Sequence, residues 1–524
     1  MNEAPKNENT ANETPLEDAP THEALWEVNA MAAAMHARPL GDLPATISGL
    51  SIDTRTLSPG DAFFAIQGDR FDGHDFLTAA TKAGAALHVV SEQKLPALGR
   101  VQSPLLVVDD VLKAMSRLAE AARARSKATI VAVTGSVGKT TTKEALRHGL
   151  SAEGSVHASA ASFNNHWGVP LSLARLPRDA RFAIFEIGMN HPGEIRPLVK
   201  LVRPHMAIIT LIAAAHLGHF RDLDEIAEAK AEIFEGLVAD GTAILNADDP
   251  RCGPLATMAR KAGVTGIRTF GETVGADYRL LSFEPAGDGA VMEAVIDGET
   301  VRVELASRGR HMAQNILAVL GAASLAGADV HRVAAALKDW RAVKGRGGRD
   351  RLPMPAGGHI ELIDESYNAN PASMRAALDV LATTQPGEGG RRIAVLGDML
   401  ELGDSARDLH AGLIEPIEAA GADIVFLAGE EMKALDDVLE SRVKREWHEN
   451  PGELLDSLLK TIRTGDVVMI KASKSIGFSP LVDKLLALYP PTAATTDAPG
   501  TPAGDAQSPA PSPADDIDPA GAAT

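Results

Sequence analysis

Residues 135–142, GSVGKTTT, decide the fold of this 524-residue chain. The apolar run from Thr129 to Val133 before them is typical of a buried parallel strand, and the KEAL segment at 143–146 after them favours a helix. A strand, a glycine-rich turn, Gly-Lys-Thr and a helix form the layout of a phosphate-binding loop. This context favours a nucleotide site, although a bare Gly-Lys-Thr can also be an ordinary turn into a helix.

We predict different roles for the residues of this loop. The glycines let backbone N–H groups approach phosphate oxygens, and the N-terminus of the following helix adds positive potential. Lys139 can neutralise the outer phosphates, and Thr140 can hold magnesium. Val133 stands where the usual consensus has its first glycine, so this loop is shorter than that consensus. We predict nucleotide contacts from Gly135, Ser136, Val137, Gly138, Lys139, Thr140 and Thr141.

Composition and charge argue against several classes of protein. The sequence has no uninterrupted apolar run of about 18 residues, so we expect no membrane span. The net charge of −19 argues against nucleic-acid binding. Cys252 is the only cysteine, which excludes an intramolecular disulfide and fits a reducing cytoplasm. The N-terminus also lacks the apolar stretch of a secretory signal.

We expect an α/β protein of three domains between two disordered tails. The tails are residues 1–24 and 491–524, which together carry −10 of the net charge. Between them we place a small α/β domain at 25–110, a central P-loop ATPase-like domain with a parallel sheet at 111–337, and a C-terminal Rossmann-like domain at 338–490.

The two larger domains are predicted from strands that alternate with helices, among them helices over 223–238 and 407–420. Such alternation indicates a mostly parallel sheet with helices on both faces. In the central domain, Asp297-Gly298 between two alternating runs adds a hairpin signal. The segment KGRGGR at 344–349 lies between the two domains, and we interpret it as a hinge.

Polar residues follow the central strands where a ligand would lie. Glu186 ends one apolar strand, His216 follows the next, and Lys230 lies on the helix after it. Because parallel strands end at one edge of a sheet, Glu186 could complete the shell of a magnesium ion held by Thr140. Plainer interpretations stay open: a solvated acid for Glu186, a structural histidine for His216 and a solvated lysine for Lys230.

The C-terminal domain also has polar residues at three strand ends. They lie in segments 364–371, 396–403 and 471–474. Asn370 before Pro371 suits a helix N-cap, but a cap needs one polar residue and this segment has five. We therefore expect the three segments to line one edge of the sheet, with the two larger domains closing over a cleft.

These motifs make the chain similar to the Mur ligases over roughly residues 45–488, and most similar to the family member that adds a dipeptide. The most specific match is the YNANP segment at 367–371, followed by Ser373-Met374. Matches of wider occurrence in the family are Asp53-Thr54-Arg55, Asp72-Gly73-His74, Asn164-Asn165, His311 and Asn315.

The resemblance implies a set of site residues. The magnesium ligands would be Thr140, Glu186, His216 and Lys230, with the lysine carbamylated because a cationic lysine cannot ligate a metal. The catalytic residues would be Lys139, Lys230, His216 and Glu186. Further ATP contacts would come from Asn315, Arg349 and Asp364, although the hinge arginine could be either Arg346 or Arg349. The substrates would contact Ser51, Thr54, Arg55, Asn164, Asn165, Tyr367, Asn368 and Asn370.

The implied activity is the ATP- and magnesium-dependent ligation of D-alanyl-D-alanine to UDP-N-acetylmuramoyl-tripeptide through an acyl phosphate, a step of peptidoglycan synthesis. The small first domain would bind the nucleotide sugar, and the enzyme would be a cytoplasmic monomer. The chain departs from the family pattern at Leu211, where asparagine is common, and at Gly218-His219, where an acid is commoner. Lys474 replaces an arginine, whose bidentate fork a lysine does not reproduce.

Two alternatives remain at this point. The nearest is the sister ligase that adds the third amino acid, diaminopimelate or lysine, and normally carries a different segment at 367–371. An alternative of another class is a non-catalytic nucleotide switch built on the same loop. Such a switch has no need of a third α/β domain with polar strand ends.

Overall fold

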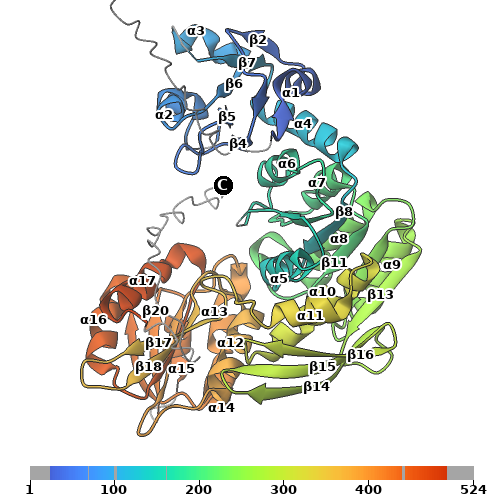
Figure 1. The fold of residues 1–524 in the computed structure, drawn as a ribbon. Coiled ribbons are helices and arrows are strands. Elements are labelled where there is room, and N and C mark those ends of the chain that lie inside the picture. Colours follow the sequence, from blue (N-terminus) through green and yellow to red (C-terminus); the bar gives the residue numbers. More distant parts are fainter. Residues whose placement is uncertain (1–23, 69, 100–102, 161, 440–442, 492–524) are drawn as a thin grey trace, which may run out of the picture. The chain divides into compact units, whose positions relative to one another are not determined.

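The structure is a computed structural model that describes residues 24–491 except for 69, 100–102, 161 and 440–442 (Figure 1). The tails predicted at both ends therefore lie almost wholly outside the described residues. The chain divides into two compact units between Ala114 and Met115. No helix in the described ranges is long and apolar enough to cross a membrane.

The first unit is a small α/β layer on a five-stranded sheet with the order β2-β7-β6-β5-β4. Strands β4 to β7 are parallel neighbours, and β2 is antiparallel to β7. Phe63 and Val90 of the sheet pack with Leu77 and Ala80 of the helix that follows β5. The elements are β1 Trp26–Glu27, α1 Val28–Met35, β2 Arg38–Leu40, β3 Thr46–Ile47, β4 Gly49–Ser51, β5 Asp61–Phe64, η1 Gly73–Phe76, α2 Leu77–Lys82, β6 Leu87–Ser91, η2 Glu92–Lys94, α3 Leu95–Leu98 and β7 Leu105–Val108, followed by the start of α4 Val111–Arg125, most of which belongs to the second unit.

The second unit contains two sheets, and the central one has the order β16-β15-β14-β13-β12-β11-β8-β10-β9. All neighbours from β9 to β14 are parallel, and β15 and β16 form an antiparallel hairpin at its edge. The elements are β8 Thr129–Thr134, α5 Lys139–Ser151, β9 Val156–Ala158, α6 Gly168–Ala174, β10 Phe182–Glu186, α7 Ile195–Val202, β11 Met206–Ile209, η3 Leu217–His219, α8 Leu223–Ala231, η4 Glu232–Gly236, β12 Thr242–Asn246, α9 Cys252–Lys261, β13 Gly266–Gly271, β14 Tyr278–Ala286, β15 Gly289–Ile296, β16 Glu299–Leu305, α10 Arg310–Leu325 and α11 Val330–Leu337.

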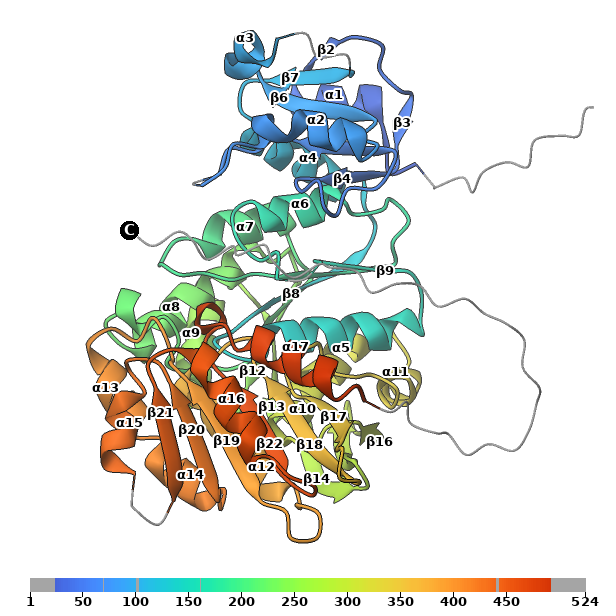
Figure 2. The same ribbon diagram turned by 90° about the vertical axis from the view of Figure 1, so that its left-hand side faces the viewer.

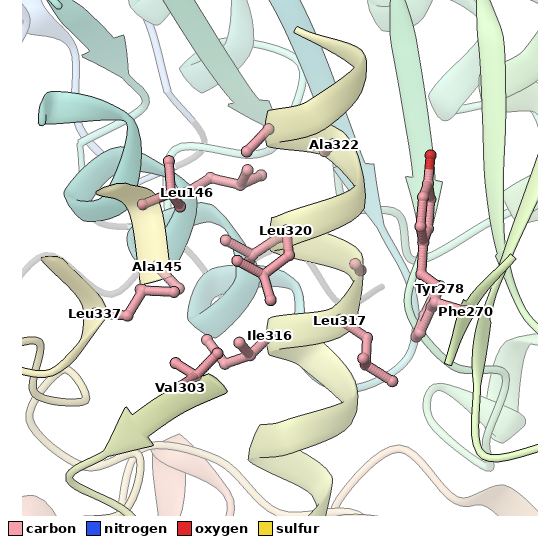
Figure 3. Packing of buried hydrophobic residues seen from close by; sticks show 14 of the residues in the cluster. Ala145, Leu146, Phe270, Tyr278, Val303, Ile316, Leu317, Leu320, Ala322 and Leu337 are labelled. Carbon is pink, nitrogen blue, oxygen red and sulfur yellow. The ribbon is translucent and has the colours of Figure 1, made fainter. Parts of the chain in front are cut away.

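Helix α10 is the centre of the core on one face of this sheet. Figure 3 shows Ile316 and Leu320 on the side of α5, whereas Leu317 lies toward Phe270 and Tyr278. Both sides of the helix are therefore covered by apolar side chains, which holds it rigidly against the sheet. Its first turns reach the phosphate loop, because a Cβ built on Gly138 would lie 2.7 Å from Oδ1 of Asn315.

The other sheet of the second unit has the order β17-β18-β22-β19-β20-β21, parallel except for β17. One apolar cluster joins its strands to α12, α14 and α15, and another joins them to α16 and α17 (Figure 2). The elements are β17 Gly348–Pro353, β18 His359–Glu365, α12 Pro371–Thr383, β19 Arg392–Gly397, η5 Gly403–Ser405, α13 Ala406–Ala411, α14 Ile414–Ala419, β20 Ile424–Ala428, α15 Lys433–Val438, β21 Lys444–His448, α16 Pro451–Thr461, β22 Val467–Lys471, η6 Lys474–Ile476 and α17 Ser479–Leu488.

The predicted α/β class is confirmed, and the differences from expectation are local. The helix expected over 223–238 ends at Ala231 and continues as the 3₁₀ turn η4. The helix expected over 407–420 is two helices, because Gly412 has a low helix propensity and interrupts it. Gly348 and Arg349 of the expected hinge already belong to β17. The predicted domain boundaries at 110/111 and 337/338 stay predictions.

Candidate active site

The phosphate loop joins β8 to α5 and needs glycine at two positions. Gly135 and Gly138 have φ values of 148° and 85°, a backbone region that side chains disfavour. A Cβ on Gly135 would lie 1.9 Å from Oγ1 of Thr210, so the neighbouring strand end leaves no room for one. Ser136 completes the attachment, since its N–H donates to Leu211 O at 2.7 Å and its hydroxyl to Ala213 O at 2.9 Å.

Lys139 begins α5 and points back over this loop. Its Nζ donates a hydrogen bond of 2.8 Å to the carbonyl of Gly135. Burial lowers the pKa of Lys139, the charge of Glu186 opposes that shift, and the charge of Arg346 adds to it. Lys139 therefore lies within electrostatic reach of a carboxylate in its own domain and of an arginine beside the C-terminal sheet.

Glu186, at the end of β10, receives two hydrogen bonds of equal length. Thr140 Oγ1 donates to Oε2 at 2.8 Å, and Asn164 Nδ2 donates to Oε1 at 2.8 Å. The glutamate is 1% exposed, so this is a buried carboxylate with neutral donors on both oxygens. The solvated-acid interpretation of Glu186 is wrong. A buried carboxylate beside a threonine hydroxyl is the hard oxygen donor set that magnesium prefers, so the residues present fit that ion.

Lys230 lies on α8 and is 2% exposed. Burial lowers the pKa of this lysine well below its ordinary value, and the charge of Lys139 lowers it further. The interpretation of Lys230 as a solvated surface residue is therefore also wrong. A lower pKa favours the neutral amine, which is the form that reacts with carbon dioxide.

His216 lies in the turn after β11, in the left-handed backbone region at φ 61°. Its Nδ1 forms a hydrogen bond with Oε2 of Glu401, which belongs to the C-terminal sheet's loops. Two residues at the end of β12 and just after it hold the segment that leads to this turn. Asn246 donates to Thr210 O at 3.0 Å, and Asp249 accepts from the N–H of Ile212 at 2.7 Å.

No three His, Cys, Asp or Glu side chains gather in a metal-binding arrangement in the described part of the chain. A magnesium ion at Glu186 would therefore need oxygen ligands of other kinds, namely the Thr140 hydroxyl, nucleotide phosphates, water and the predicted carbamate of Lys230.

Tyr367 stands at the junction of the two sheets. Its hydroxyl is 2.6 Å from Oγ of Ser162, a residue of the central domain. The guanidinium of Arg346 lies 4.0 Å from the ring centroid and the ammonium of Lys474 lies 5.6 Å from it, so the ring is flanked by cations. Lys471, which is buried nearby, donates to the carbonyl of Asn368 at 2.8 Å.

The side chains of Asn370 and Asn165 have structural roles at the starts of helices, which the sequence only suggested. The Asn370 side chain accepts from the N–H of Ser373 at 2.9 Å, and the Ser373 hydroxyl receives the N–H of Asn370, so the helix-cap interpretation of Asn370 is confirmed. Asn165 Oδ1 accepts from the N–H of Gly168 at 2.9 Å, where α6 begins. The amide NH₂ groups of both residues remain able to face a ligand.

Among the remaining predicted ATP contacts, Asp364 holds the turn before β17. It accepts from the N–H groups of Gly345 at 2.9 Å and Ser366 at 3.0 Å. Arg349 is paired with Glu361 and donates to Asp288 O at 3.2 Å. Of the two candidate hinge arginines, the one within electrostatic reach of Lys139 is thus Arg346.

The three predicted substrate contacts of the first unit lie at the end of β4 and in the turn after it. Ser51 is buried, and its hydroxyl donates to the carbonyl of Asp53 at 2.9 Å. Arg55 pairs with the carboxylate of Asp53 at 3.0 Å and keeps about half of its side chain exposed. Thr54 lies between Asp53 and Arg55 in a turn that is closed by a hydrogen bond of 3.2 Å from the N–H of Thr56 to Asp53 O.

Cys252, at the start of α9, is half-buried. Burial raises the pKa of its thiol, and the carboxylates of Asp249 and Asp248 raise it further. The thiol is therefore mostly protonated at neutral pH and a poor nucleophile.

Three family models match the chain. They are "Mur ligase family, catalytic domain" over residues 46–123, "Mur ligase middle domain" over 133–323 and "Mur ligase, glutamate ligase domain" over 351–474. The UDP-N-acetylmuramoyl-tripeptide–D-alanyl-D-alanine ligase of Rickettsia prowazekii is 33% identical over 434 residues, which cover 83% of this chain and 94% of the relative.

Solved structures agree with this match. MurF from Acinetobacter baumannii has a TM-score of 0.75 and 29% identity, with 88% of this chain and 99% of that chain covered. MurF ligase from Thermotoga maritima, solved in complex with ADP, has a TM-score of 0.69 and 26% identity, with 83% and 96% covered.

Proposed function

The chain belongs to the Mur ligase family, and from that premise we infer that it is an ATP-dependent ligase that joins D-alanyl-D-alanine to UDP-N-acetylmuramoyl-tripeptide. The observation that carries this inference is the combination of the phosphate loop with the Tyr367–Asn370 segment at the junction of two α/β sheets. The curated relatives that cover most of the chain are named for this same ligation, so the sister ligase is not favoured.

ATP would lie with its phosphates on the loop from Gly135 to Thr141. The N-terminus of α5 favours the phosphate oxygens there. To neutralise the outer phosphate, the Nζ of Lys139 would break its hydrogen bond with Gly135 O or donate to Gly135 O and a phosphate oxygen together. Asn315, which approaches Gly138, is placed to contact the nucleotide from α10.

We propose that Thr140, Glu186, His216 and carbamylated Lys230 hold magnesium. The ion would supply positive charge between two anions that must meet, the substrate carboxylate and the γ-phosphate. Glu186 and Thr140 are already oriented toward each other at 2.8 Å, so their oxygens need little rearrangement to share a ligand. Asn164 fixes the other oxygen of Glu186, which keeps the carboxylate from rotating.

The reaction has two displacements. The terminal carboxylate of the tripeptide attacks the γ-phosphorus, ADP leaves, and an acyl phosphate forms. The free amine of D-alanyl-D-alanine then attacks the acyl carbon, a proton leaves the nitrogen, and inorganic phosphate departs as the amide bond forms. Lys139 and Arg346 lie where they can balance the phosphate charge in both steps. Water has to be excluded between the steps, because it would hydrolyse the acyl phosphate.

The substrate contacts are proposed separately for each unit. Tyr367, Asn368 and Asn370 are proposed to shape the dipeptide site, with Lys474 balancing its carboxylate. Asn164 and Asn165 are proposed to contact the peptide end of the nucleotide sugar. Ser51, Thr54 and Arg55 of the first unit are proposed to bind its UDP-sugar part. A cytoplasmic location is proposed as well, because the single cysteine and the need for ATP suit a reducing compartment. We also propose that the enzyme is a monomer.

The test is phosphate release and product formation with purified protein. It should turn over ATP only when a UDP-N-acetylmuramoyl-tripeptide and D-alanyl-D-alanine are both present, with the diaminopimelate and lysine tripeptides tried in parallel. Free D-alanine, L-lysine and diaminopimelate should fail as amine donors. Ligation of a single amino acid to the dipeptide-bearing precursor would favour the sister ligase, and slow hydrolysis without either substrate would favour a nucleotide switch.

A further inference from the structure

The loop after β19 of the C-terminal sheet makes two hydrogen bonds with the turn that carries His216. The carboxylate of Glu401 accepts a hydrogen bond from Nδ1 of His216. The main-chain carbonyl of the same glutamate accepts from the N–H of Gly218 at 2.9 Å. One residue therefore holds the turn through both its side chain and its backbone, across 185 positions of sequence.

The 216–219 turn and the 401–403 loop both have unusual backbone conformations where they meet. His216 and Glu401 both lie in the left-handed region, with φ values of 61° and 62°, which is uncommon for residues other than glycine. Gly218 and Gly403 meet without side chains, since a Cβ on Gly403 would lie 2.9 Å from the Cα of Gly218. Strained backbone of this kind persists only where surrounding contacts hold it.

The chemistry of the hydrogen bond decides what His216 can do. An ionised carboxylate only accepts, so the Nδ1 of His216 carries the proton and Nε2 keeps its lone pair. A histidine that donates one ring N–H to a carboxylate while the other nitrogen faces a metal is the arrangement that orients metal ligands. In this chain the carboxylate and the histidine come from different domains of the second unit.

We propose that Glu401 is a positioning residue that fixes the tautomer and the ring orientation of His216, so that the C-terminal domain completes the metal site of the central domain. This proposal rests on the proposed function, because it takes His216 as a ligand. It extends that function by making metal affinity depend on docking of the 401–403 loop on the 216–219 turn.

Two further histidines lie near the Glu401 carboxylate. The rings of His191 and His219 are 4.5 Å apart, and both lie within electrostatic reach of the Glu401 carboxylate. Glu401 keeps 44% of its side chain exposed and His216 keeps 25%, so the pair is reachable by solvent and can separate without opening a core. Such a contact between domains is suited to forming and breaking during each turnover.

The experiment is a titration of the full-length protein with Mn²⁺ in the presence of saturating ADP, followed by electron paramagnetic resonance of the free ion. Glu401→Ala should weaken Mn²⁺ binding about 10- to 100-fold, the usual cost of removing a carboxylate that orients a metal-ligating histidine. Glu401→Gln retains an acceptor oxygen and should lose much less. Asp404→Asn, which removes one exposed charge from the adjacent 3₁₀ turn, is the matched control and should bind as the unmodified protein does.

A double-mutant cycle separates positioning from general damage. If Glu401 acts through His216, Glu401→Ala should cost nothing further in a His216→Ala background. Three outcomes would each overturn the proposal. The first is that Glu401→Ala binds Mn²⁺ as tightly as the unmodified protein. The second is that Glu401→Ala lowers the Mn²⁺ affinity as much in the His216→Ala background as it does alone, and the third is that the unmodified protein does not bind Mn²⁺ in the presence of ADP. The ligase assay above is independent of this titration, so a failed proposal leaves the proposed function standing, and a failed ligase assay is recognised on its own.

Discussion

Lys230 and Lys139 lie close enough in the central domain that they repel each other. Burial lowers the pKa of Lys230 well below its ordinary value, and the positive charge of Lys139 lowers it further. Two lysines this close are easiest to keep together when one of them is neutral or is converted to an anion. A carbamate on Lys230 would turn the repulsion into an attraction and provide oxygen ligands at the same point.

The first prediction concerns this lysine. Lys230→Ala should be nearly inactive in ATP-dependent ligation, and millimolar acetate or formate should restore part of the activity by supplying the missing carboxylate oxygens. Lys261→Ala, on the exposed side of α9, is the control and should respond to neither change. Full activity of Lys230→Ala without any added carboxylate would remove the carbamate from the mechanism.

Lys139→Ala should lower the turnover of ATP by about 10²-fold or more, because the γ-phosphate loses its cationic partner. Lys139 donates to Gly135 O, so the loop itself could loosen in this variant. Thermal unfolding and binding of a fluorescent ADP analogue distinguish the two cases. A folded variant with near-normal turnover would contradict the assignment of the phosphate loop.

Tyr367→Phe removes only the hydroxyl that meets Ser162 at 2.6 Å. A net hydrogen-bond contribution of about 1 kcal/mol corresponds to roughly a fivefold loss of kcat/KM for D-alanyl-D-alanine. Ser162→Ala should cause a similar loss, and the double variant should add little to either. An effect of equal size on the KM for ATP would place Tyr367 outside the dipeptide site.

Acid should loosen the first unit through His88. This histidine is buried between strands, and burial lowers its pKa to about 4. Between the ordinary pKa near 6.5 and that value, the unfolded chain takes up a proton that the folded chain refuses, so stability falls as the pH drops through this window. The full loss is roughly 3 kcal/mol.

Hydrogen exchange of peptides from β5 and β6 checks this pH dependence. Protection should decline from pH 6.5 toward pH 4 in the unmodified protein and decline less in His88→Gln, which cannot titrate but can still bond to Thr81. Identical profiles for the two proteins would show that another group controls the acid response.

Much of the fold follows from local pattern, and what does not is mostly at sheet edges. The strands beside the phosphate loop are continuous apolar runs, and β8 occupies the predicted residues. Strands β17 and β21 read GRDRLP and KREWH, lie at the two edges of their sheet and have few apolar residues to bury. Their pairing is decided by the neighbouring strand, which no pattern within them reveals.

The candidate site divides in the same way. Glu186 and Thr140 could be predicted, because parallel strands and the loop between them bring residues to one edge. The contacts of Ser162 and Glu401 could not be predicted, because each joins the site only through a hydrogen bond between domains far apart in sequence. Asn370 shows the remaining ambiguity: the cap and the substrate contact use different atoms of one amide, so the sequence supports both.

The single half-buried thiol of Cys252 makes this chain a convenient background for engineering. A dye or spin label that reacts with thiolates should label it slowly, and replacing one residue by serine would leave no competing thiol. Paired cysteines could then be introduced on the 216–219 turn and the 401–403 loop, where glycines already bring the backbones together. A reversible cross-link there would trap one arrangement of the catalytic domains, and reduction would release it.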